Sequence, residues 1–202
     1  MSNFSEKKIQ KQFGGNLQAF VSGGGALDKN VGEFLNAVGL PTLQGYGLTE
    51  TSPVVSCNLP GNIKVETVGP PFKTNQVKIA DDGEILVKGE NVMLGYWNKE
   101  KETNEILKNG WLHTGDIGEI DSKGYLKITD RKKDIIVNHG GDNISPSKIE
   151  NTICNEEKIK QCLVYGDKKN YLVALVVVDK KDKNDSTIRS IIEKYNKKLS
   201  II

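Results

Sequence analysis

Four short segments of the sequence combine residue types that suit the binding of a nucleotide. The first, residues 44–52, reads QGYGLTETS. Tyr46 could stack on a base, Thr49 could donate a hydrogen bond to a phosphate oxygen, and Glu50 could ligate a Mg²⁺ ion that bridges phosphates. A surface turn capped by Thr and Glu would use the same residues, and the spacing alone leaves both interpretations open.

The second segment is a run of glycines that follows an apolar stretch. Residues 22–25 read SGGG, so the backbone of Gly23, Gly24 and Gly25 could lie against a flat ligand or a phosphate. A plain tight turn is the alternative. Because no Gly-Lys-Ser/Thr follows the glycines, the segment is not a Walker loop.

The third segment, GWLHTGDIG at residues 110–118, places an aspartate between glycines. The carboxylate of Asp116 could accept both hydroxyls of a ribose, or it could form an Asx-turn with its own backbone. His113 is interpreted as a packing residue at the end of its strand rather than as a catalytic base.

The fourth segment, TDRKKDIIVNHGGDNISPSKIE at residues 129–150, begins with a charged run and continues into a glycine-containing loop. The planar guanidinium of Arg131 could bind a ribose or a phosphate, and the charged run could be an interdomain hinge. A solvated charge run is the alternative.

The elements expected around the first two segments are those of an α/β fold. Residues 28–38 predict a helix that begins behind Asp28 as N-cap, between apolar runs at 17–21 and 42–44. One face of this helix is expected to carry Val31, Phe34, Leu35 and Val38.

Beyond Gly69 the pattern changes to short alternating strands. Residues 75–80 and 84–89 flank an Asp-Asp-Gly turn and predict a β-hairpin. Further strands are expected around 111–113, 117–120 and 124–128, which together indicate an antiparallel subdomain.

From Asp134 onward the pattern indicates a separate small α+β domain. An apolar DIIV stretch and the glycine-containing loop precede a helix that begins at Ser145-Pro146. Strands are expected at about 160–165 and 171–178. A last helix is expected to carry Ile188, Ile191, Ile192 and Tyr195 at helical spacing.

The composition is that of an ordinary globular protein. The chain has 202 residues, 37% of them hydrophobic, and a formal charge of +2, so no global field indicates a partner such as nucleic acid or a membrane surface. No membrane-spanning run or signal peptide is visible, which predicts a cytoplasmic protein. The cysteines Cys57, Cys154 and Cys162 lack paired or metal-type spacing and are expected to be reduced packing residues.

Taken in order, these motifs resemble those of the adenylate-forming acyl-CoA synthetase superfamily. The stretches that carry the resemblance are VSGGGAL (21–27), QGYGLTETSPVVS (44–56), GEILVKGENVMLGYWN (83–98), GWLHTGDIG (110–118) and GYLKITDRKKDIIVNHGGDNISPSKIE (124–150). The second and fifth resemble the long-chain fatty acid branch.

The resemblance implies an α/β fold with an antiparallel β-subdomain, followed by a small α+β domain. Residues 1–68 would be the last α/β portion of the large AMP-binding domain, and 69–130 its β-subdomain. Residues 131–133 would be the hinge, and 134–202 the small C-terminal domain.

The resemblance also implies roles for individual residues. Thr49 would touch the α-phosphate and Glu50 would ligate Mg²⁺, as the two catalytic residues. The nucleotide-binding residues would be Gly23, Gly24, Gly25, Gln44, Gly45, Tyr46, Gly47, Thr49, Asp116, Arg131, Gly140 and Gly141. Lys133 would be the pivot of the small domain. The loop from Gly140 to Asn143 would swing toward the pantetheine tunnel, with Asp142 where many relatives have Glu.

The implied reaction is ligation of a fatty acid to CoA. ATP and the acid form acyl-AMP and pyrophosphate, and CoA then displaces AMP, so the implied cofactors are ATP or AMP, Mg²⁺ and CoA as co-substrate. The implied partners are fatty acid, ATP and CoA, with no nucleic acid. The resemblance allows peripheral membrane association of the full enzyme.

Two parts of the family pattern are not found. A phosphate loop with its lysine is absent from residues 1–20, and the catalytic lysine is expected beyond the last helix. The chain is therefore expected to be a partial ligase, inactive alone, from a split gene, a remnant or a partial gene model. A separately encoded N-terminal half would then be a partner. The alternatives are a non-catalytic nucleotide-binding or interaction module, and a fragment of an adenylation domain for another carboxylic acid.

Overall fold

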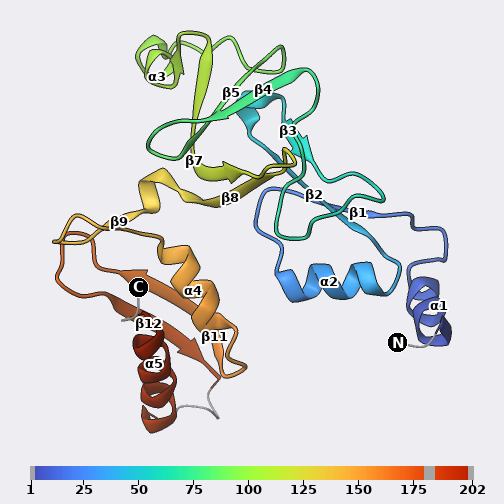
Figure 1. Cartoon of the computed structure of the whole chain (residues 1–202), viewed down its shortest axis with the longest axis vertical. Helices are drawn as coiled ribbons and strands as arrows, with labels where there is room; N and C mark the ends of the chain where they lie inside the picture. The colour runs from blue at the N-terminus through green and yellow to red at the C-terminus, as the bar shows by residue number, and fades with distance from the viewer. Residues whose placement is uncertain (1–2, 180–184, 200–202) are drawn as a thin grey trace. The chain divides into compact units, whose positions relative to one another are not determined.

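The computed structural model describes residues 3–179 and 185–199, which form parts of two compact units. The first unit comprises Met1–Ile128 and the second Thr129–Ile202. Figure 1 shows the order of their elements along the chain. No helix within the described ranges is both long enough and apolar enough to cross a bilayer.

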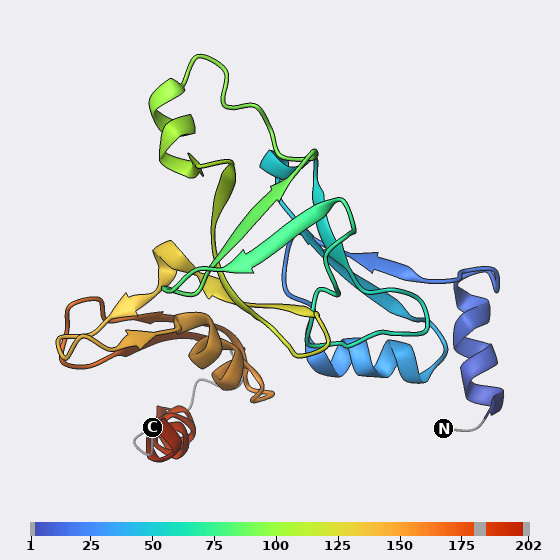
Figure 2. The same ribbon diagram turned by 45° about the horizontal axis from the view of Figure 1, so that its top comes forward.

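The first unit begins with an α/β arrangement (Figure 2). Helix α1 (Asn3–Gln12) precedes β1 (Phe20–Ser22), helix α2 (Lys29–Ala37), β2 (Thr42–Gly47), the short 3₁₀ helix η1 (Thr49–Thr51) and β3 (Val54–Cys57). Strand β2 lies between β1 and β3, parallel to β1 and antiparallel to β3. Helix α2 begins where expected, because the Asp28 carboxylate accepts a hydrogen bond from the Val31 amide (3.0 Å).

The expected apolar face of α2 is only partly buried. Val38 is fully buried, but Val31 and Phe34 are 48% and 45% exposed. The reason lies at Gly32, where a Cβ atom would stand 2.6 Å from the Val65 side chain. The absence of a side chain at Gly32 lets this turn of the helix approach Val65 closely, and the packed face is therefore rotated away from Val31 and Phe34.

An antiparallel sheet completes the first unit. Its elements are β4 (Asn75–Ile79), β5 (Glu84–Gly89), helix α3 (Glu100–Ile106), β6 (Leu107–Lys108), β7 (Trp111–Ile120) and β8 (Leu126–Arg131). The strand order is β4-β5-β7-β6, with β8 also on β7, and the expected β4–β5 hairpin is confirmed. Strand β8 begins in the first unit and ends in the second.

The expectation of two strands at 111–113 and 117–120 is wrong, because β7 runs unbroken between them. The intervening residues stay attached to β5. The Thr114 hydroxyl donates to the Ile85 carbonyl (2.7 Å), and the Gly115 amide donates to the Glu84 carboxylate (2.9 Å). Side chains of β7 alternate in burial along most of its length, as in a strand with one face on a core.

One hydrophobic core joins the two sheets of the first unit. Its buried members come from β2, β3, β5, β7 and β8, and they are Tyr46, Val55, Ile85, Val87, Leu112 and Leu126. A core shared by both sheets makes the α/β part and the antiparallel part fold as one body.

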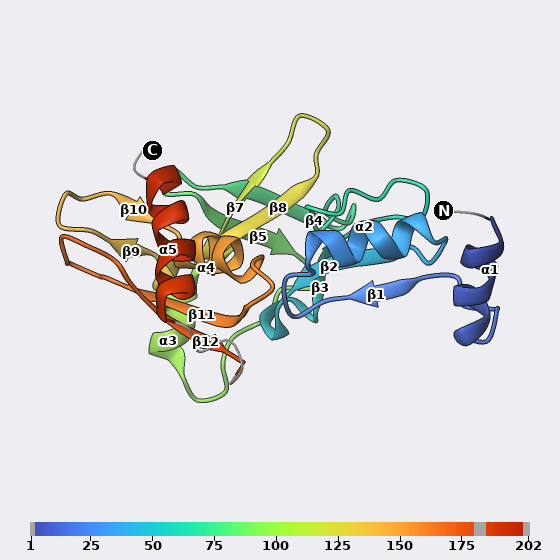
Figure 3. The ribbon, with the colours of Figure 1, turned by 90° about the horizontal axis from the view of Figure 1, so that it is seen from below.

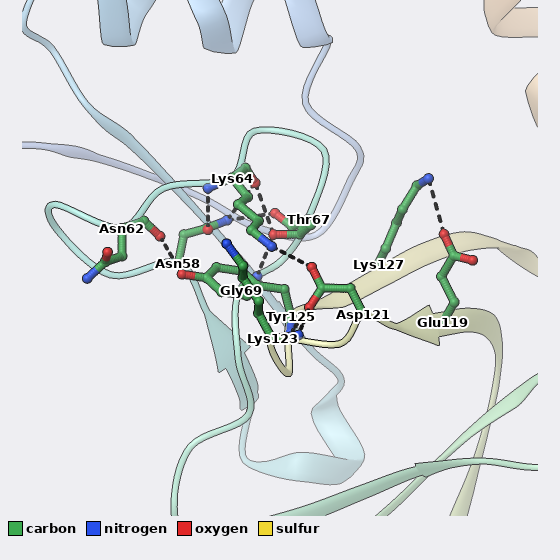
Figure 4. Close-up of polar contacts among 10 residues, drawn as sticks. All are labelled: Asn58, Asn62, Lys64, Thr67, Gly69, Glu119, Asp121, Lys123, Tyr125 and Lys127. Atoms are coloured by element: carbon green, nitrogen blue, oxygen red, sulfur yellow. Dashed lines mark hydrogen bonds and ion pairs between the residues drawn. The ribbon is translucent and has the colours of Figure 1, made fainter.

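A polar network fastens the loop after β3 to the turn between β7 and β8 (Figure 4). Asn58 is 1% exposed, and its side chain donates to the carbonyls of Thr67 (2.6 Å) and Lys64 (3.3 Å) and accepts from the Lys64 amide (3.0 Å). The Lys64 ammonium contacts the Asp121 carboxylate and lies 4.1 Å from the centre of the Tyr125 ring. The loop is thus held at its base by Asn58 and at its outer side by Lys64.

The second unit is the small α+β structure that the sequence predicts (Figure 3). Its elements after β8 are η2 (Lys132–Asp134), β9 (Ile136–Val137), β10 (Asn143–Ile144), α4 (Pro146–Cys154), β11 (Ile159–Tyr165), β12 (Val173–Val178) and α5 (Asp185–Leu199). Helix α4 begins as expected, with the Ser145 hydroxyl accepting from the Lys148 amide (3.2 Å).

The core of the second unit lies between its helices and the β11–β12 hairpin. Its buried residues are Ile153, Ile159, Ile191 and Tyr195. Cys154 and Cys162 pack against this core as free thiols, and Cys57 is also free. On the opposite face of the hairpin, Leu163 and Leu175 are paired across the strands and exposed.

Candidate functional site

The glycine-rich segment and residues 44–47 meet at one edge of the first sheet. Because β1 and β2 are parallel, their carboxyl ends lie at the same edge, and Ser22 pairs with Gln44. A Cβ atom on Gly23 would lie 3.8 Å from the Gly45 carbonyl oxygen, and Gly24 has a positive φ of +78°. In open α/β sheets, ligands bind outside this carboxyl edge.

Gln44 supports this edge through its side chain. It is 7% exposed, its amide nitrogen donates to the Val65 carbonyl, and its amide oxygen accepts a 3.4 Å hydrogen bond from the Leu27 amide. These contacts connect the loops before α2 and after β3 to the strand that carries Tyr46.

Close packing against the β3 segment explains why glycine occupies two positions of QGYGLTETS. A Cβ atom on Gly47 would stand 1.7 Å from the Pro53 carbonyl oxygen, and one on Gly45 would stand 3.3 Å from that of Ser56. Both glycines therefore allow β2 to approach the β3 segment closely. They shape the edge, whether or not a ligand also lies against them.

A buried hydrogen bond joins the first and third segments. The Tyr46 hydroxyl donates to the Asp116 carboxylate at 2.6 Å, and the two residues are 7% and 2% exposed. Tyr46 comes from β2 and Asp116 from β7. The ring of Tyr46 is a core side chain in this structure, and its hydroxyl orients the carboxylate.

Glu84 organises the turn before Asp116. Its carboxylate is 3.0 Å from His113 Nδ1 and accepts from the Gly115 amide, and the residue is 4% exposed. His113 is thus partnered by a buried carboxylate. Sequence reasoning missed Glu84, although an acidic residue at an otherwise apolar strand start was a visible signal.

The two threonines of η1 differ in burial and in hydrogen bonding. Thr51 is fully buried, and its hydroxyl accepts from the Leu48 amide (2.9 Å) and donates to the Pro53 carbonyl (2.6 Å). Thr49 is exposed, and its side chain makes no hydrogen bond within the described part of the chain. The structural cap is therefore Thr51, which leaves the Thr49 hydroxyl for other partners.

Glu50 is held by a residue that sequence reasoning did not single out. The Tyr96 hydroxyl donates to Glu50 Oε1 at 2.6 Å, and this hydrogen bond, with burial as a smaller cause, raises the pKa of Tyr96 to about 12. The signal was present in the sequence, since Tyr96 lies inside the GENVMLGYWN motif.

The donor set around Glu50 suits a cation that arrives with phosphates. Among the residues that the structure describes, no group of three or more His, Cys, Asp or Glu side chains could hold a metal by itself. Mg²⁺ in phosphate-transfer sites is often held by one or two carboxylates, substrate phosphates and water. A single half-buried carboxylate such as Glu50 fits that pattern.

The fourth segment lies in the second unit. Arg131 ends β8 and Lys133 lies in η2, and both are exposed. The β9–β10 hairpin closes through Asn138, which donates from its side chain to the Asp142 carboxylate (2.8 Å) and accepts from the Asp142 amide (2.8 Å). Gly140 and Gly141 form the exposed tip of this hairpin, where the Gly141 amide donates to the Asn138 carbonyl (3.1 Å).

Comparison with protein families gives two matches. Residues 1–97 match the family described as AMP-binding enzyme, and residues 133–201 match the AMP-binding enzyme C-terminal domain. The two matched regions follow each other in chain order and together cover most of the sequence.

Curated relatives include ligases from bacteria and mammals. The long-chain-fatty-acid–CoA ligase FadD15 of Mycobacterium bovis is 43% identical over 173 residues, which cover 86% of this chain and 29% of the relative. Long-chain-fatty-acid–CoA ligase 6 of Rattus norvegicus is 40% identical over 186 residues, covering 85% of this chain and 27% of that protein. The chain therefore spans less than a third of the length of these relatives.

Solved structures with the same fold come from related enzymes. The o-succinylbenzoate CoA synthetase of Bacillus subtilis, in complex with its acyl-adenylate intermediate, has a TM-score of 0.78 and 27% identity, over 93% of this chain and 43% of that one. An ATP-bound RpMatB-BxBclM chimera has a TM-score of 0.80 and 27% identity, over 91% and 40% of the two chains. The expected α/β, antiparallel and α+β parts are confirmed by this likeness, and the chain belongs to the adenylate-forming, AMP-binding superfamily of acyl-CoA synthetases.

Proposed function

We propose that the chain carries the nucleotide-binding face and the small domain of an ATP-dependent long-chain fatty acid–CoA ligase. In that reaction the fatty acid carboxylate attacks the α-phosphate of ATP to give acyl-AMP and pyrophosphate, and the CoA thiol then displaces AMP. The observation that carries the proposal is the Tyr46–Asp116 hydrogen bond, which brings two nucleotide motifs together inside one unit. The names of the curated relatives support the fatty acid as the substrate class.

In this proposal the first unit binds the adenosine part of the nucleotide. The oriented carboxylate of Asp116 accepts the ribose hydroxyls, and the backbone from Gly23 to Gly25 lies along the adenine and acyl groups. The free hydroxyl of Thr49 donates to the α-phosphate. Glu50 would hold Mg²⁺, which when bound neutralises charge on the phosphates.

The second unit supplies the parts that act after the acyl-AMP has formed. Arg131 contacts ribose or phosphate, Lys133 is the pivot, and the tip at Gly140 and Gly141 approaches the pantetheine of CoA. The hairpin supports this role, because Asn138 and Asp142 close it while Gly140 and Gly141 stay exposed at its tip.

The proposed division follows the sequence expectation: 1–68 and 69–130 in the large domain, 131–133 as hinge, and 134–202 as the small domain. CoA as co-substrate, a cytoplasmic location, a separately encoded N-terminal half and peripheral membrane association of the full enzyme belong to the same proposal.

Calorimetric titration with AMP tests the nucleotide assignment. Asp116→Asn keeps an acceptor for the Tyr46 hydroxyl but removes the charge that would hold the ribose, so we expect AMP to bind at least about tenfold more weakly. Asp81→Asn is the matched control, because Asp81 is an exposed turn residue of the β4–β5 hairpin. Equal affinities of the wild type and Asp116→Asn would remove the ribose assignment and with it the proposed site.

A further inference from the structure

The loop between β5 and α3 is hydrogen-bonded to the turn that carries Glu50. The Asn91 side chain donates to the carbonyls of Thr51 (2.8 Å) and Val54 (3.2 Å), and the Met93 amide donates to the Glu50 carbonyl (2.9 Å). The backbone of η1 is therefore held from one side by this loop.

The same loop is anchored at its other end to α3. The Tyr96 amide donates to the Thr103 hydroxyl (2.9 Å), which in turn donates to the Lys99 carbonyl (2.8 Å). Gly95 has a φ of +154°, and a Cβ atom there would stand 2.8 Å from the Thr103 methyl group. Tyr96 thus projects from a loop that is fixed at both ends.

Burial of apolar surface does not explain where the Tyr96 side chain lies. Its neighbours Leu94 and Trp97 are 101% and 89% exposed, whereas Tyr96 is 37% exposed. The specific contact of its ring end is the 2.6 Å hydrogen bond to Glu50 Oε1. The tyrosine is therefore directed toward the carboxylate rather than into a core.

The hydrogen bond to Glu50 Oε1 leaves the second oxygen, Oε2, available to a ligand. A carboxylate offers about four lone-pair positions on two oxygens. The hydrogen bond from Tyr96 to Oε1 restrains the Glu50 side chain, and Oε2 makes no hydrogen bond within the described part of the chain. A ligand that binds a preset carboxylate avoids the entropy cost of ordering it.

We propose that Tyr96 is a positioning residue for the cation that accompanies the nucleotide: its hydroxyl occupies Glu50 Oε1 and leaves Oε2 for a Mg²⁺ ion bound to phosphate. The inference rests on the proposed function, since it takes Glu50 as the carboxylate that binds the cation. Tyr96 acts through Glu50 and touches neither nucleotide nor metal.

The test compares ATP binding with and without the cation. Calorimetry gives the dissociation constant of ATP in EDTA and in saturating Mg²⁺, and the ratio of the two measures how much the cation strengthens binding. We expect Tyr96→Phe to lower this ratio about five- to tenfold, because it removes the charge-assisted hydrogen bond to Glu50. Binding in EDTA should be unchanged, because Glu50 is proposed to bind the cation and not the nucleotide itself. Trp97→Phe, at the exposed neighbour, is the matched control and should keep the wild-type ratio.

A second arm separates positioning from general support of the loop. If Tyr96 acts through Glu50, then Tyr96→Phe should have no further effect on the ratio in a Glu50→Gln background. An equal loss in both backgrounds overturns the inference. A ratio unchanged by Tyr96→Phe overturns it as well, and an increased ratio would make Tyr96 a competitor of the cation.

The outcomes for the wild type keep the two proposals apart. If the wild type binds no ATP in either condition, the proposed function fails and the role of Tyr96 fails with it. If the wild type binds ATP and Mg²⁺ strengthens that binding, nucleotide binding by the chain stands whatever Tyr96→Phe does, and only the role of Tyr96 is then under test. Thermal unfolding monitored by tryptophan fluorescence confirms that each variant is folded before it is titrated.

Discussion

Replacing Asn58 by alanine should destabilise the first unit without touching the nucleotide-binding residues directly. Asn58 is 1% exposed, and its side chain makes three hydrogen bonds with backbone groups of the loop that follows β3. Its own amide donates to the Gln44 carbonyl (2.8 Å), which links the loop to the strand of Tyr46. Alanine keeps this backbone contact and removes only the side-chain bonds.

The expected loss follows from those bonds. Each hydrogen bond contributes about 0.5–1.5 kcal/mol net, and a buried acceptor left without a donor costs about 1–3 kcal/mol. The Thr67 carbonyl, whose donor is only 2.6 Å away, belongs to a residue that is 9% exposed. The free energy of unfolding should therefore fall by about 2–4 kcal/mol, which lowers the urea midpoint by about 1–2 M.

Urea unfolding followed by tryptophan fluorescence measures this loss. Both tryptophans, Trp97 and Trp111, lie in the first unit, so the signal reports on the unit that contains Asn58. Asn62→Ala is the matched control, because Figure 4 shows the Asn62 side chain pointing away from the network, and only its carbonyl accepts, from Tyr125 (3.1 Å). A loss below about 0.5 kcal/mol for Asn58→Ala, or equal losses in both variants, would show that the Asn58 side chain does not stabilise the loop.

Three further predictions follow from single positions. Gly47→Ala should prevent normal folding, since its Cβ would stand 1.7 Å from a carbonyl oxygen, whereas Gly25→Ala, with nothing within 4 Å, should leave the urea midpoint unchanged. The hydrogen bond from Lys64 lowers the pKa of Asp121 to about 2, so this pair stabilises the fold above the unfolded pKa near 4, and that contribution is lost as the pH falls through about 2. A carboxyl NMR titration should show the low pKa in the wild type and a higher one in Lys64→Met. Burial, followed by the Cys154 and Glu150 charges, raises the pKa of the Cys162 thiol to about 11. Iodoacetamide at pH 8 should therefore alkylate Cys162 more slowly in the folded chain than in urea, and equal rates by mass spectrometry would contradict the burial.

Local signals in the sequence were sufficient for most elements. Asp28 and Ser145 mark helix starts through hydrogen bonds within three residues, and the alternation around the turn at 81–83 identifies the β4–β5 hairpin. The failures are non-local. The packed face of α2 depends on Val65, and the continuity of β7 depends on Glu84 and Ile85, none of which a local pattern can place.

The candidate site divides in the same way. Tyr46, Glu50 and Asp116 could be selected by residue type and motif, because carboxylates, hydroxyls and glycines suit nucleotide chemistry. That Tyr46 binds Asp116 depends on how the sheets pack, and that Tyr96 binds Glu50 depends on the path of a loop. The spacing of the motifs along the chain predicts neither of these two contacts.

The distance along the chain between Tyr46 and Asp116 has a consequence for synthesis on the ribosome. The two residues are 70 positions apart, and the amide of Val68 likewise donates to the carbonyl of Leu126. At about 5–20 residues per second, the partner of Tyr46 is translated roughly 4–14 s later. During that interval the apolar residues of β2 and β3 have no finished core to enter, so the nascent first unit should be a client for chaperones. The β11–β12 hairpin pairs residues that are near neighbours in sequence, and it can close as soon as it emerges.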